Sequence, residues 1–405
     1  MGLDERSWET IASDSVLLKA VGNWRENSEK WLEYSIERLN ETVRVNPLRE
    51  DIVWVENWLE EIGGTKIEWF TGVGSAWNLP FPRGKAEGDV KIILSALHET
   101  GRLTRQEAVS MIPAIVLDAK PGELVLDMCA SPGSKTTQIA EHLEGSGIVM
   151  ANEIASSRIN TLVANVKRHG SITPIITHHD GRFIPKVPET GFDKILVDAP
   201  CTGSATTRKN PDVWKKWLPS GGKSLHKLQL ELLLKAINLT KPGGKIVYST
   251  CSLDPVENEA VISEVLRLSK EISLVPMSEK LVDLPGRCGM TDWPQLDDSG
   301  NIIESSKIVK SMLPPTDIDI KEELKKCLRI WNDDVKAGGF FVAVLKKEEE
   351  YVEKIVDFDK IIEPEKVKPD EINFPQPISS KIEDMILDTL GWDEKNLWIR
   401  GKSIL

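Results

Sequence analysis

The sequence predicts an α/β fold in which a doubly wound sheet carries helices on both faces. Short apolar runs alternate with helical segments between residues 121 and 277, which is typical of right-handed βαβ units and a parallel sheet. Two of these runs end in a cysteine, at Cys201 and at Cys251. The carboxyl ends of neighbouring parallel strands open onto one crevice where ligands bind, so we expect both thiols in a single site.

The composition divides the chain into three regions. We expect an N-terminal accessory region over residues 1–120, the α/β domain over residues 121–347, and a charged linker with a short C-terminal extension over residues 348–405. In the first region, apolar residues at helical spacing predict helices. These helices span residues 29–39, 52–62 and 105–115, with a strand and turn over residues 43–47.

The strands of the α/β domain are expected to be buried on both faces, because their apolar runs are continuous. They span residues 123–129, 147–153, 173–179, 192–198 and 244–250. A helix over residues 223–240 precedes the last of them, and a late strand over residues 339–345 follows, with residues 327–331 antiparallel to it. Four prolines between residues 280 and 315 predict a long surface excursion, and a short helix is expected over residues 380–390.

The bulk composition indicates a cytoplasmic protein that is not inserted in a membrane. No run approaches the roughly 18 apolar residues that a membrane span needs, and the N-terminus lacks the character of a signal peptide. The net charge of −12 argues against a protein that simply coats nucleic acid. Residues 202–227, however, carry six basic residues against one acid, which fits either phosphate contacts or a solvated loop. We expect a monomer.

The five cysteines fit neither a zinc site nor a disulfide framework. They lie far apart, at positions 129, 201, 251, 288 and 327, and no two form a CxxC pair. We therefore expect reduced thiols and no metal site.

One apolar run leads directly into a turn of small residues that can seat a cofactor. The run ends at Cys129, and the turn continues through Ala130, Ser131, Pro132, Gly133, Ser134 and Lys135. A phosphate-binding P-loop would need glycine where Ser134 and Cys129 stand, so a nucleotide triphosphatase is a poor fit. The free N–H groups of the following helix favour a carboxylate, which suits the amino-acid part of S-adenosylmethionine. Such turns also occur as plain strand–helix connections.

Acidic residues close the next three strands. Glu153 is placed to accept hydrogen bonds from ribose hydroxyls, and Asp180 is placed to reach an adenine amino group. Any one of them alone would more often be a helix cap or a solvated side chain. Glu153, Asp180 and Asp198 together favour ligand binding.

The segments around the two thiols have the residue types needed for covalent chemistry on a pyrimidine. A thiolate can add to C6 of the ring, which turns C5 into a carbon nucleophile able to accept a methyl group. Asp198 is positioned to hydrogen-bond N3 of the ring and stabilise the adduct. A single cysteine is more often a core residue, but two on strands expected to be adjacent weaken that explanation.

These segments resemble the RNA cytosine-5 methyltransferases of the RsmB/NOP2/NSUN type, and among them the NSUN2/Trm4-like tRNA enzymes. The segments are DMCASPGSKTTQ (127–138), DAPCTGSATTRKNPDVWKKW (198–217), VYSTCSLDPVENEAVI (247–262) and CLRIWNDDVKAGGFFVAVLKK (327–347), with TGRLTRQEAVSMIP (100–113) upstream. The resemblance implies a Rossmann-like methyltransferase domain with a mixed seven-stranded sheet, and a smaller α+β N-terminal region that binds RNA. It also implies S-adenosylmethionine as cofactor and tRNA as substrate.

The same resemblance assigns roles to individual residues. Cys251 matches the nucleophile that attacks C6, and Cys201 matches the thiol that helps to release the RNA. Asp198 matches the residue that contacts the cytosine, and Lys135 faces the reaction centre. The implied cofactor contacts are Cys129, Ala130, Ser131, Pro132, Gly133, Ser134, Lys135, Glu153, Arg158, Asp180 and Asp198.

The basic strip after Cys201 is the expected place for RNA. Its residues Arg208, Lys209, Lys215 and Lys216 would hold phosphates while the target base leaves its stack. Trp214 and Trp217 would either stack on a base or pack together as one helix face. Two alternatives stay open: the same chemistry on ribosomal RNA, and a non-catalytic RNA-binding protein of this fold.

Overall fold

The computed structural model divides the chain into two compact units, Met1–Val356 and Asp357–Leu405. It describes residues 7–349 except 187, 278, 279, 282, 305–307 and 336. Beyond residue 349 it describes residues 376–377, 383–384, 398–400 and 403–404.

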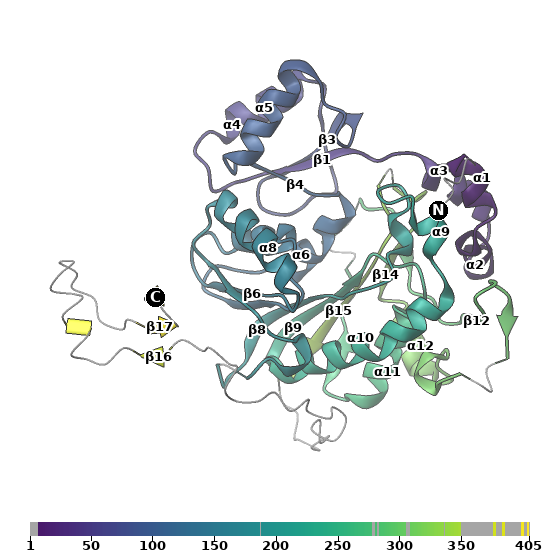
Figure 1. Ribbon diagram of the computed structural model, residues 1–405. Helices are drawn as coiled ribbons and strands as arrows, with labels where there is room; N and C mark the ends of the chain where they lie inside the picture. Colours follow the sequence, from purple (N-terminus) through teal and green to yellow (C-terminus); the bar gives the residue numbers. More distant parts are fainter. Residues whose placement is uncertain are drawn as a thin grey trace. The chain divides into compact units, whose positions relative to one another are not determined.

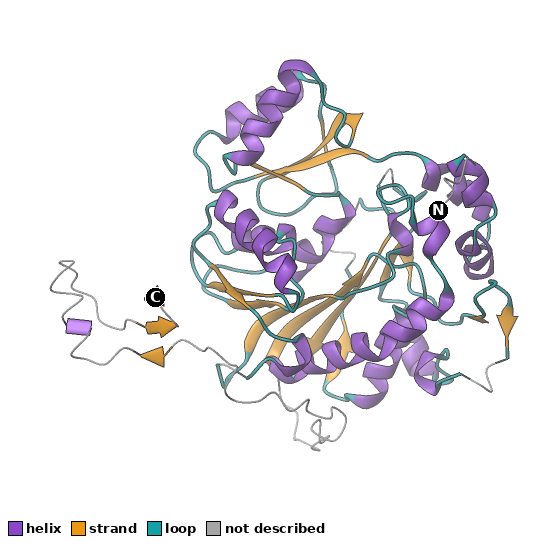
Figure 2. Cartoon of the chain, viewed as in Figure 1, coloured by secondary structure: helices purple, strands orange, loops and turns teal. Residues whose placement is uncertain are grey.

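A mixed sheet of nine strands forms the centre of the first unit (Figures 1 and 2). The strand order is β11-β14-β15-β9-β8-β5-β6-β7, with β10 paired to β15. The parallel strands are β5 (Leu124–Asp127), β6 (Ile148–Asn152), β7 (Pro174–Thr177), β8 (Phe192–Asp198) and β9 (Thr240–Thr250). The antiparallel strands are β10 (Ile272–Leu274), β11 (Arg287–Cys288), β14 (Leu328–Ile330) and β15 (Phe340–Lys347). The expected strands of the α/β domain are confirmed, and the short β10 and β11 extend the expected set of seven.

Helices cover both faces of this sheet (Figure 1). They are α6 (Ile112–Leu117), α7 (Ser134–His142), α8 (Ser156–His169), α10 (Pro219–Leu239), α11 (Glu259–Leu268) and α12 (Ile318–Leu324). Helix α6 packs on β8, β9 and β15, while α10 packs on β8 and β9. The β5, β8, β9 and β15 strands supply fully buried residues to the core between these layers, as their continuous apolar runs predict.

The N-terminal part forms a second, smaller sheet of four strands in the order β2-β3-β1-β4. The strands are β1 (Asn40–Val45), β2 (Thr65–Lys66), β3 (Ser75–Pro82) and β4 (Leu103–Arg105), with α4 (Ile52–Glu61) and α5 (Gly88–Glu99) beside them. Helices α1 (Trp8–Ser13), α2 (Val16–Trp24) and α3 (Ser28–Ile36) precede this sheet. The predicted second helix is confirmed, and Gly63, at φ 82°, follows its end.

A buried ion pair joins the small sheet to the large one. Arg44 of β1 donates to the Glu141 carboxylate of α7 at 2.6 Å, and both side chains are fully buried. Arg44 also donates to the hydroxyl of Thr137 at 3.1 Å, and Glu141 lies 2.9 Å from His169 of α8. Moving the small sheet away from α7 would separate this pair and leave an uncompensated charge in the interior. The cluster therefore holds the small sheet against α7.

Two expectations about local structure were wrong or incomplete. The helix predicted over 105–115 is instead β4, a loop, a 3-10 turn at Val109–Met111 and then α6. The excursion between 280 and 315 is not all surface, because Trp293 and Leu296 are buried there, and Trp293 donates to the carbonyl of Met312. It contains β12 (Gln295–Leu296), β13 (Ile302–Ile303) and a 3-10 turn at Lys310–Met312.

The second unit contains a small antiparallel sheet in the order β16-β17-β18. Its strands are β16 (Gln376–Pro377), β17 (Trp398–Arg400) and β18 (Ser403–Ile404). The helix expected over 380–390 lies outside the described residues, apart from residues 383–384, which are helical.

Candidate active site

The two thiols at the ends of β8 and β9 lie almost in contact. These strands pair in parallel with Asp198 opposite Ser249, so the loops that follow them start side by side. The Sγ atoms of Cys201 and Cys251 are 3.2 Å apart. The expected adjacency of the two strands is therefore confirmed.

The two thiols differ in their electrostatic surroundings. The hydrogen bond from Cys201 lowers the pKa of Cys251, with the nearby Lys135 ammonium acting in the same direction against burial. The same hydrogen bond, burial and the Glu257 carboxylate raise the pKa of Cys201 well above its usual value. Cys251 is therefore the thiol that more readily ionises, and Cys201 is the one that keeps its proton.

A single buried carboxylate, that of Glu257, binds both loops. It accepts hydrogen bonds from the Thr202 backbone N–H at 2.9 Å and from the Ser252 hydroxyl at 2.5 Å. The Thr202 hydroxyl and the Gln229 amide also donate to it. Thr202 directly follows Cys201 and Ser252 directly follows Cys251, so Glu257 links the two cysteine loops.

Lys135 and Asp198 form an ion pair beside the thiols. The Lys135 Nζ lies 2.7 Å from an Asp198 oxygen, and the Ser249 hydroxyl donates to the other oxygen at 2.8 Å. Burial opposes the charge on Lys135, but Asp198 outweighs it and raises the pKa of the ammonium. Lys135 follows β5, and β5 lies between β8 and β6, so the pair occupies the point where the strand order reverses.

The turn before α7 has the geometry of an anion seat. Gly133 is the N-cap of α7 at φ 105°, and no side chain caps the first N–H groups. A Cβ at Gly133 would stand 2.9 Å from Leu162 Cδ1, so this approach of turn and α8 requires glycine. Asn165 of α8 fixes the turn by donating to the Pro132 carbonyl at 2.7 Å.

The residues before this turn are buried and unsuited to nucleophilic work. Burial raises the pKa of Asp127 to about 7, while the Thr136 hydroxyl donates to one of its oxygens at 2.7 Å. Its other oxygen is buried without a hydrogen-bond partner among the described residues. Burial also raises the pKa of Cys129, so this third thiol stays protonated.

Glu153 is linked to the cofactor turn through Arg158, whereas Asp180 is bound by Arg182. Glu153 is 2% exposed and lies 3.5 Å from the guanidinium of Arg158, which donates to the Ser131 carbonyl at 2.6 Å. Asp180 instead accepts several hydrogen bonds from Arg182, the shortest at 2.6 Å. Arg182 is the charge that lowers the pKa of Asp180 against burial.

The predicted basic strip is split up in the folded chain. Arg208 is buried and donates to the carbonyls of Glu37 and Ala337, so its guanidinium is bound within the protein. Lys215 lies 4.9 Å from the ring centre of Trp8, and Lys216 pairs with Asp212 at 2.8 Å. Only Lys209 of the four lines the cavity that reaches Cys251.

Trp214 and Trp217 are both packing residues. Each is 4% exposed, and they meet Trp31 and Trp24 edge-on at 5.4 and 5.7 Å between ring centres. The packing alternative therefore holds for both tryptophans.

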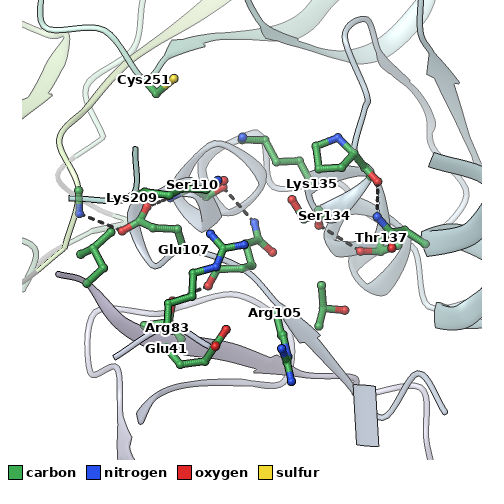
Figure 3. Close-up of a pocket in the computed structure, with 18 of the residues that line it drawn as sticks. Glu41, Arg83, Arg105, Glu107, Ser110, Ser134, Lys135, Thr137, Lys209 and Cys251 are labelled. Carbon is green, nitrogen blue, oxygen red and sulfur yellow. Dashed lines mark hydrogen bonds between the residues drawn. The ribbon is translucent and has the colours of Figure 1, made fainter. Parts of the chain in front are cut away.

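A cavity of about 520 Å³ opens between the two sheets and contains residues that the sequence did not single out. One wall carries Lys135, Asp198 and Cys251, and the facing wall comes from the small sheet (Figure 3). The new lining residues include Glu41, Arg83, Arg105 and Glu107. Glu107 accepts hydrogen bonds from the backbone N–H groups of Ser110 and Gly338. No local spacing rule connects these positions with the thiols.

The described part of the chain contains neither a metal-binding cluster nor a membrane-spanning helix. No group of three or more His, Cys, Asp or Glu residues there is arranged to hold a metal ion. No helix in that part has the length and apolar character needed to cross a bilayer.

Comparison with known proteins places the chain among RNA methyltransferases. Residues 114–346 match the family described as "16S rRNA methyltransferase RsmB/F". A tRNA (cytosine(49)-C(5))-methyltransferase of Pyrococcus abyssi is 37% identical over 80% of this chain and 93% of its own length. The multisite-specific tRNA:(cytosine-C(5))-methyltransferase of Saccharomyces cerevisiae is 40% identical over 69% of this chain and 44% of its own length. The chain thus spans less than half of the yeast relative.

Solved structures agree with these relatives. A methyltransferase homologue from Pyrococcus horikoshii is 30% identical with a TM-score of 0.61, covering 81% of this chain and 93% of its own. NSun6 from the same organism, solved with a cofactor analogue, has the same fold at 19% identity and a TM-score of 0.61, covering 83% and 98% of the two chains. The sequence match spans more than half of the chain and includes the cofactor turn and both thiol loops. As the resemblance predicted, this chain belongs to the RsmB/F family of RNA methyltransferases.

Proposed function

We propose that this protein transfers a methyl group from S-adenosylmethionine to C5 of cytosine in tRNA. The single observation that carries the proposal is the pair of thiols 3.2 Å apart, beside the Lys135–Asp198 ion pair. A reaction that passes through a covalent adduct needs one group to attack and another to assist departure, and the thiols differ in pKa in the sense that these tasks require.

The residues around the turn fit S-adenosylmethionine. The uncapped N-terminus of α7 would bind its carboxylate, and the buried Glu153 would accept hydrogen bonds from its ribose. Arg158 would hold the turn against Glu153, since it contacts both. We keep Cys129–Lys135, Asp180 and Asp198 as proposed contacts, although Asp180 would have to share its carboxylate with Arg182. When bound, the cofactor supplies the electrophilic methyl group.

The protein's own groups carry the remaining steps of the proposed mechanism. The Cys251 thiolate attacks C6 of the cytosine, and the electron pair of the C5–C6 bond becomes available at C5 to form the new carbon–carbon bond. Asp198 hydrogen-bonds to N3 of the ring through a proton that N3 accepts as the ring gains electron density, and Lys135 stabilises the Cys251 thiolate. Once Cys251 is bonded to C6, Cys201 gives up its own proton to solvent. The resulting Cys201 thiolate takes the proton from C5, the C5–C6 double bond re-forms, and Cys251 departs with its electron pair.

Ribosomal RNA is the second candidate substrate. The names of the yeast and archaeal relatives favour tRNA, whereas the family description names 16S rRNA. We propose a monomer acting in the cytoplasm. Lys209 is kept as an RNA contact and Lys215 and Lys216 stay predictions, while Arg208 is better explained by its backbone partners.

Bisulfite sequencing of total RNA from cells with and without the protein tests the function. We expect at least one tRNA cytosine to lose its methyl group when the protein is absent, and the purified protein to restore it with S-adenosylmethionine. Loss confined to ribosomal RNA would establish the second candidate. Saturable cofactor binding with no methylation of any RNA would leave only a non-catalytic RNA-binding protein.

A further inference from the structure

The facing wall of the cavity, formed by the small N-terminal sheet, has a charge pattern that the reaction at Cys251 does not use. Arg83 follows β3, and Arg105 ends β4. Lys209 comes from the loop after Cys201 and lines the same cavity. In Figure 3 the Arg83 side chain extends from the small sheet toward the middle of the cavity, facing the side where Lys135 and Cys251 lie. Three cations from two sheets thus line the space where the base must enter.

Among the described residues these three cations form no ion pair, unlike Lys135 and Arg168 of the same cavity, although the carboxylates of Glu41 and Glu107 also line it. Lys135 pairs with Asp198 at 2.7 Å, and Arg168 pairs with Glu99 at 3.4 Å. No ion pair or side-chain hydrogen bond of Arg83, Arg105 or Lys209 is present among the described residues. The Nε atom of Arg105 is buried and unpartnered within that part of the chain. Burying an unpaired donor of this kind costs free energy, which a bound acceptor would recover.

The electrostatics link the cations to each other and to the thiol. Burial and the neighbouring Arg83 charge lower the pKa of Lys209, whereas Cys251 and the Glu107 carboxylate act in the opposite direction. Arg83, Lys209 and Cys251 therefore lie within electrostatic reach of one another. A pair of like charges that forms no ion pair of its own is stabilised when an anion binds between its members.

We propose that Arg83 and Lys209 together bind the phosphodiester next to the cytosine being methylated, with Arg105 further along the same path. This inference rests on the proposed function and adds the route of the RNA backbone. The backbone would pass between the two sheets, rather than along α9 (Val213–Lys216), where Lys216 is paired with Asp212 and Lys215 lies over Trp8. A cavity of about 520 Å³ is of a size that holds a ligand as large as a nucleotide.

The salt dependence of tRNA binding tests this route in the full-length protein. Arg83→Gln and Lys209→Gln each remove one charge from a side chain that forms no ion pair or hydrogen bond among the described residues, so we expect both variants to fold. Each should weaken binding of a tRNA transcript about threefold to tenfold and reduce the slope of log K against log salt by about one. Both should raise KM for RNA while leaving S-adenosylmethionine affinity unchanged. Charge reversal in Arg83→Glu should enlarge the loss.

Lys227→Gln on α10 is the matched control. Its side chain is 83% exposed and does not line the cavity, and its 3.7 Å pair with Glu231 is worth little. We expect wild-type affinity and slope for this variant. Wild-type slopes in Arg83→Gln and Lys209→Gln, with a reduced slope in Lys215→Gln or Lys216→Gln, would overturn the route in favour of α9. The assay measures binding and not methyl transfer. Failure of the proposed route would therefore be distinguishable from failure of the proposed function, in which the wild-type protein binds tRNA but transfers no methyl group.

Discussion

The loops after β8 and β9 carry the same side chain to the same place, yet they prepare it differently. Cys251 directly follows the longer strand, and both its neighbour Cys201 and the Lys135 ammonium favour its thiolate. Cys201 faces Glu257 and donates toward Cys251, so its proton is retained. The two thiols, 3.2 Å apart, are therefore unequal chiefly because Cys201 donates their mutual hydrogen bond and Cys251 accepts it, with Lys135 and Glu257 acting in the same sense.

This asymmetry is what a two-step covalent reaction needs. Attack on C6 requires a thiolate near neutral pH, since the thiol itself is a poor nucleophile. The protonated neighbour stabilises that thiolate by hydrogen bonding, and it becomes available as a base only after the adduct has formed. The direction of the asymmetry agrees with the roles that the family resemblance implies for the two cysteines.

Removing the Cys251 thiol should have the largest effect, because it is the thiol that more readily ionises. Cys251→Ala should reduce methyl transfer by more than about a thousandfold, because no other described thiol is both ionisable and close to Asp198. Transfer of labelled methyl groups to tRNA measures this, and a denaturing gel should show no protein–RNA band. Turnover at the wild-type rate would show that another group attacks the base.

Removing the second thiol should still allow the first half of the reaction, although more slowly at neutral pH, because the hydrogen bond that lowers the pKa of Cys251 is lost. Cys201→Ala should still form the adduct and transfer one methyl group, but release should stop, so multiple turnover is lost. A protein–RNA complex that survives denaturation is the expected product, with about one methyl group per protein molecule. Normal methylation without such a complex would remove Cys201 from the mechanism.

How far the sequence predicted this site depends on where each residue lies relative to the strands. Cys201, Cys251, Asp198 and Lys135 are at or just beyond strand ends, and parallel strands bring such positions together by geometry alone. Their convergence was therefore predictable and is confirmed. The facing wall of the cavity was not predictable from the sequence. Arg83 lines the cavity only because a separate sheet docks there, and the spacing of residues along the chain does not indicate such docking.

The wrong local predictions have equally specific causes. Residues 108–117 are nearly all buried, since α6 is enclosed by β8, β9 and β15. A helix that is buried on every side has apolar residues all around it, so its sequence lacks the helical spacing of apolar residues from which helix ends are predicted. Pro113 is accommodated at the start of α6, where its missing N–H costs nothing. Arg208 looked like part of a surface strip because composition cannot distinguish a guanidinium that binds phosphate from one that binds backbone carbonyls.

The Lys135 charge can be varied to sharpen the difference between the thiols. Lys135→Met removes a cation that lowers the pKa of Cys251, so the thiolate should form at higher pH. We expect the acid limb of the kcat profile to move up by about one unit, which costs about tenfold in rate at neutral pH and is recovered in alkaline buffer. Lys135→Arg keeps the charge and should restore the limb. An unchanged limb in Lys135→Met, measured at saturating cofactor, would contradict this origin of the asymmetry.

Glu257 offers the most selective change, since it touches both loops but neither thiol directly. Glu257→Gln keeps the shape of the side chain, but its amide would present donors to the Thr202 and Ser252 hydroxyls that now donate to the carboxylate. We expect kcat to fall about tenfold with KM for RNA unchanged, because a misplacement of about 1 Å can cost up to about a hundredfold. If the residue positions Cys201 for release, the fraction of enzyme trapped as adduct should rise in the steady state.

Asp254→Asn is the control that separates positioning from general stability. Asp254 is a neighbouring buried acid whose pKa burial raises to about 8, so it is largely neutral near pH 7, and it accepts a hydrogen bond from the Val256 backbone N–H at 2.9 Å. Asparagine replaces a mostly neutral group there and should leave the adduct fraction at the wild-type level. An effect of Glu257→Gln on thermal stability alone, with the adduct fraction unchanged, would show that the carboxylate supports the fold without setting the distance between the thiols. If the adduct fraction instead rises in Glu257→Gln and stays at the wild-type level in Asp254→Asn, the Glu257 carboxylate that joins the two loops is what keeps the two thiols unequal.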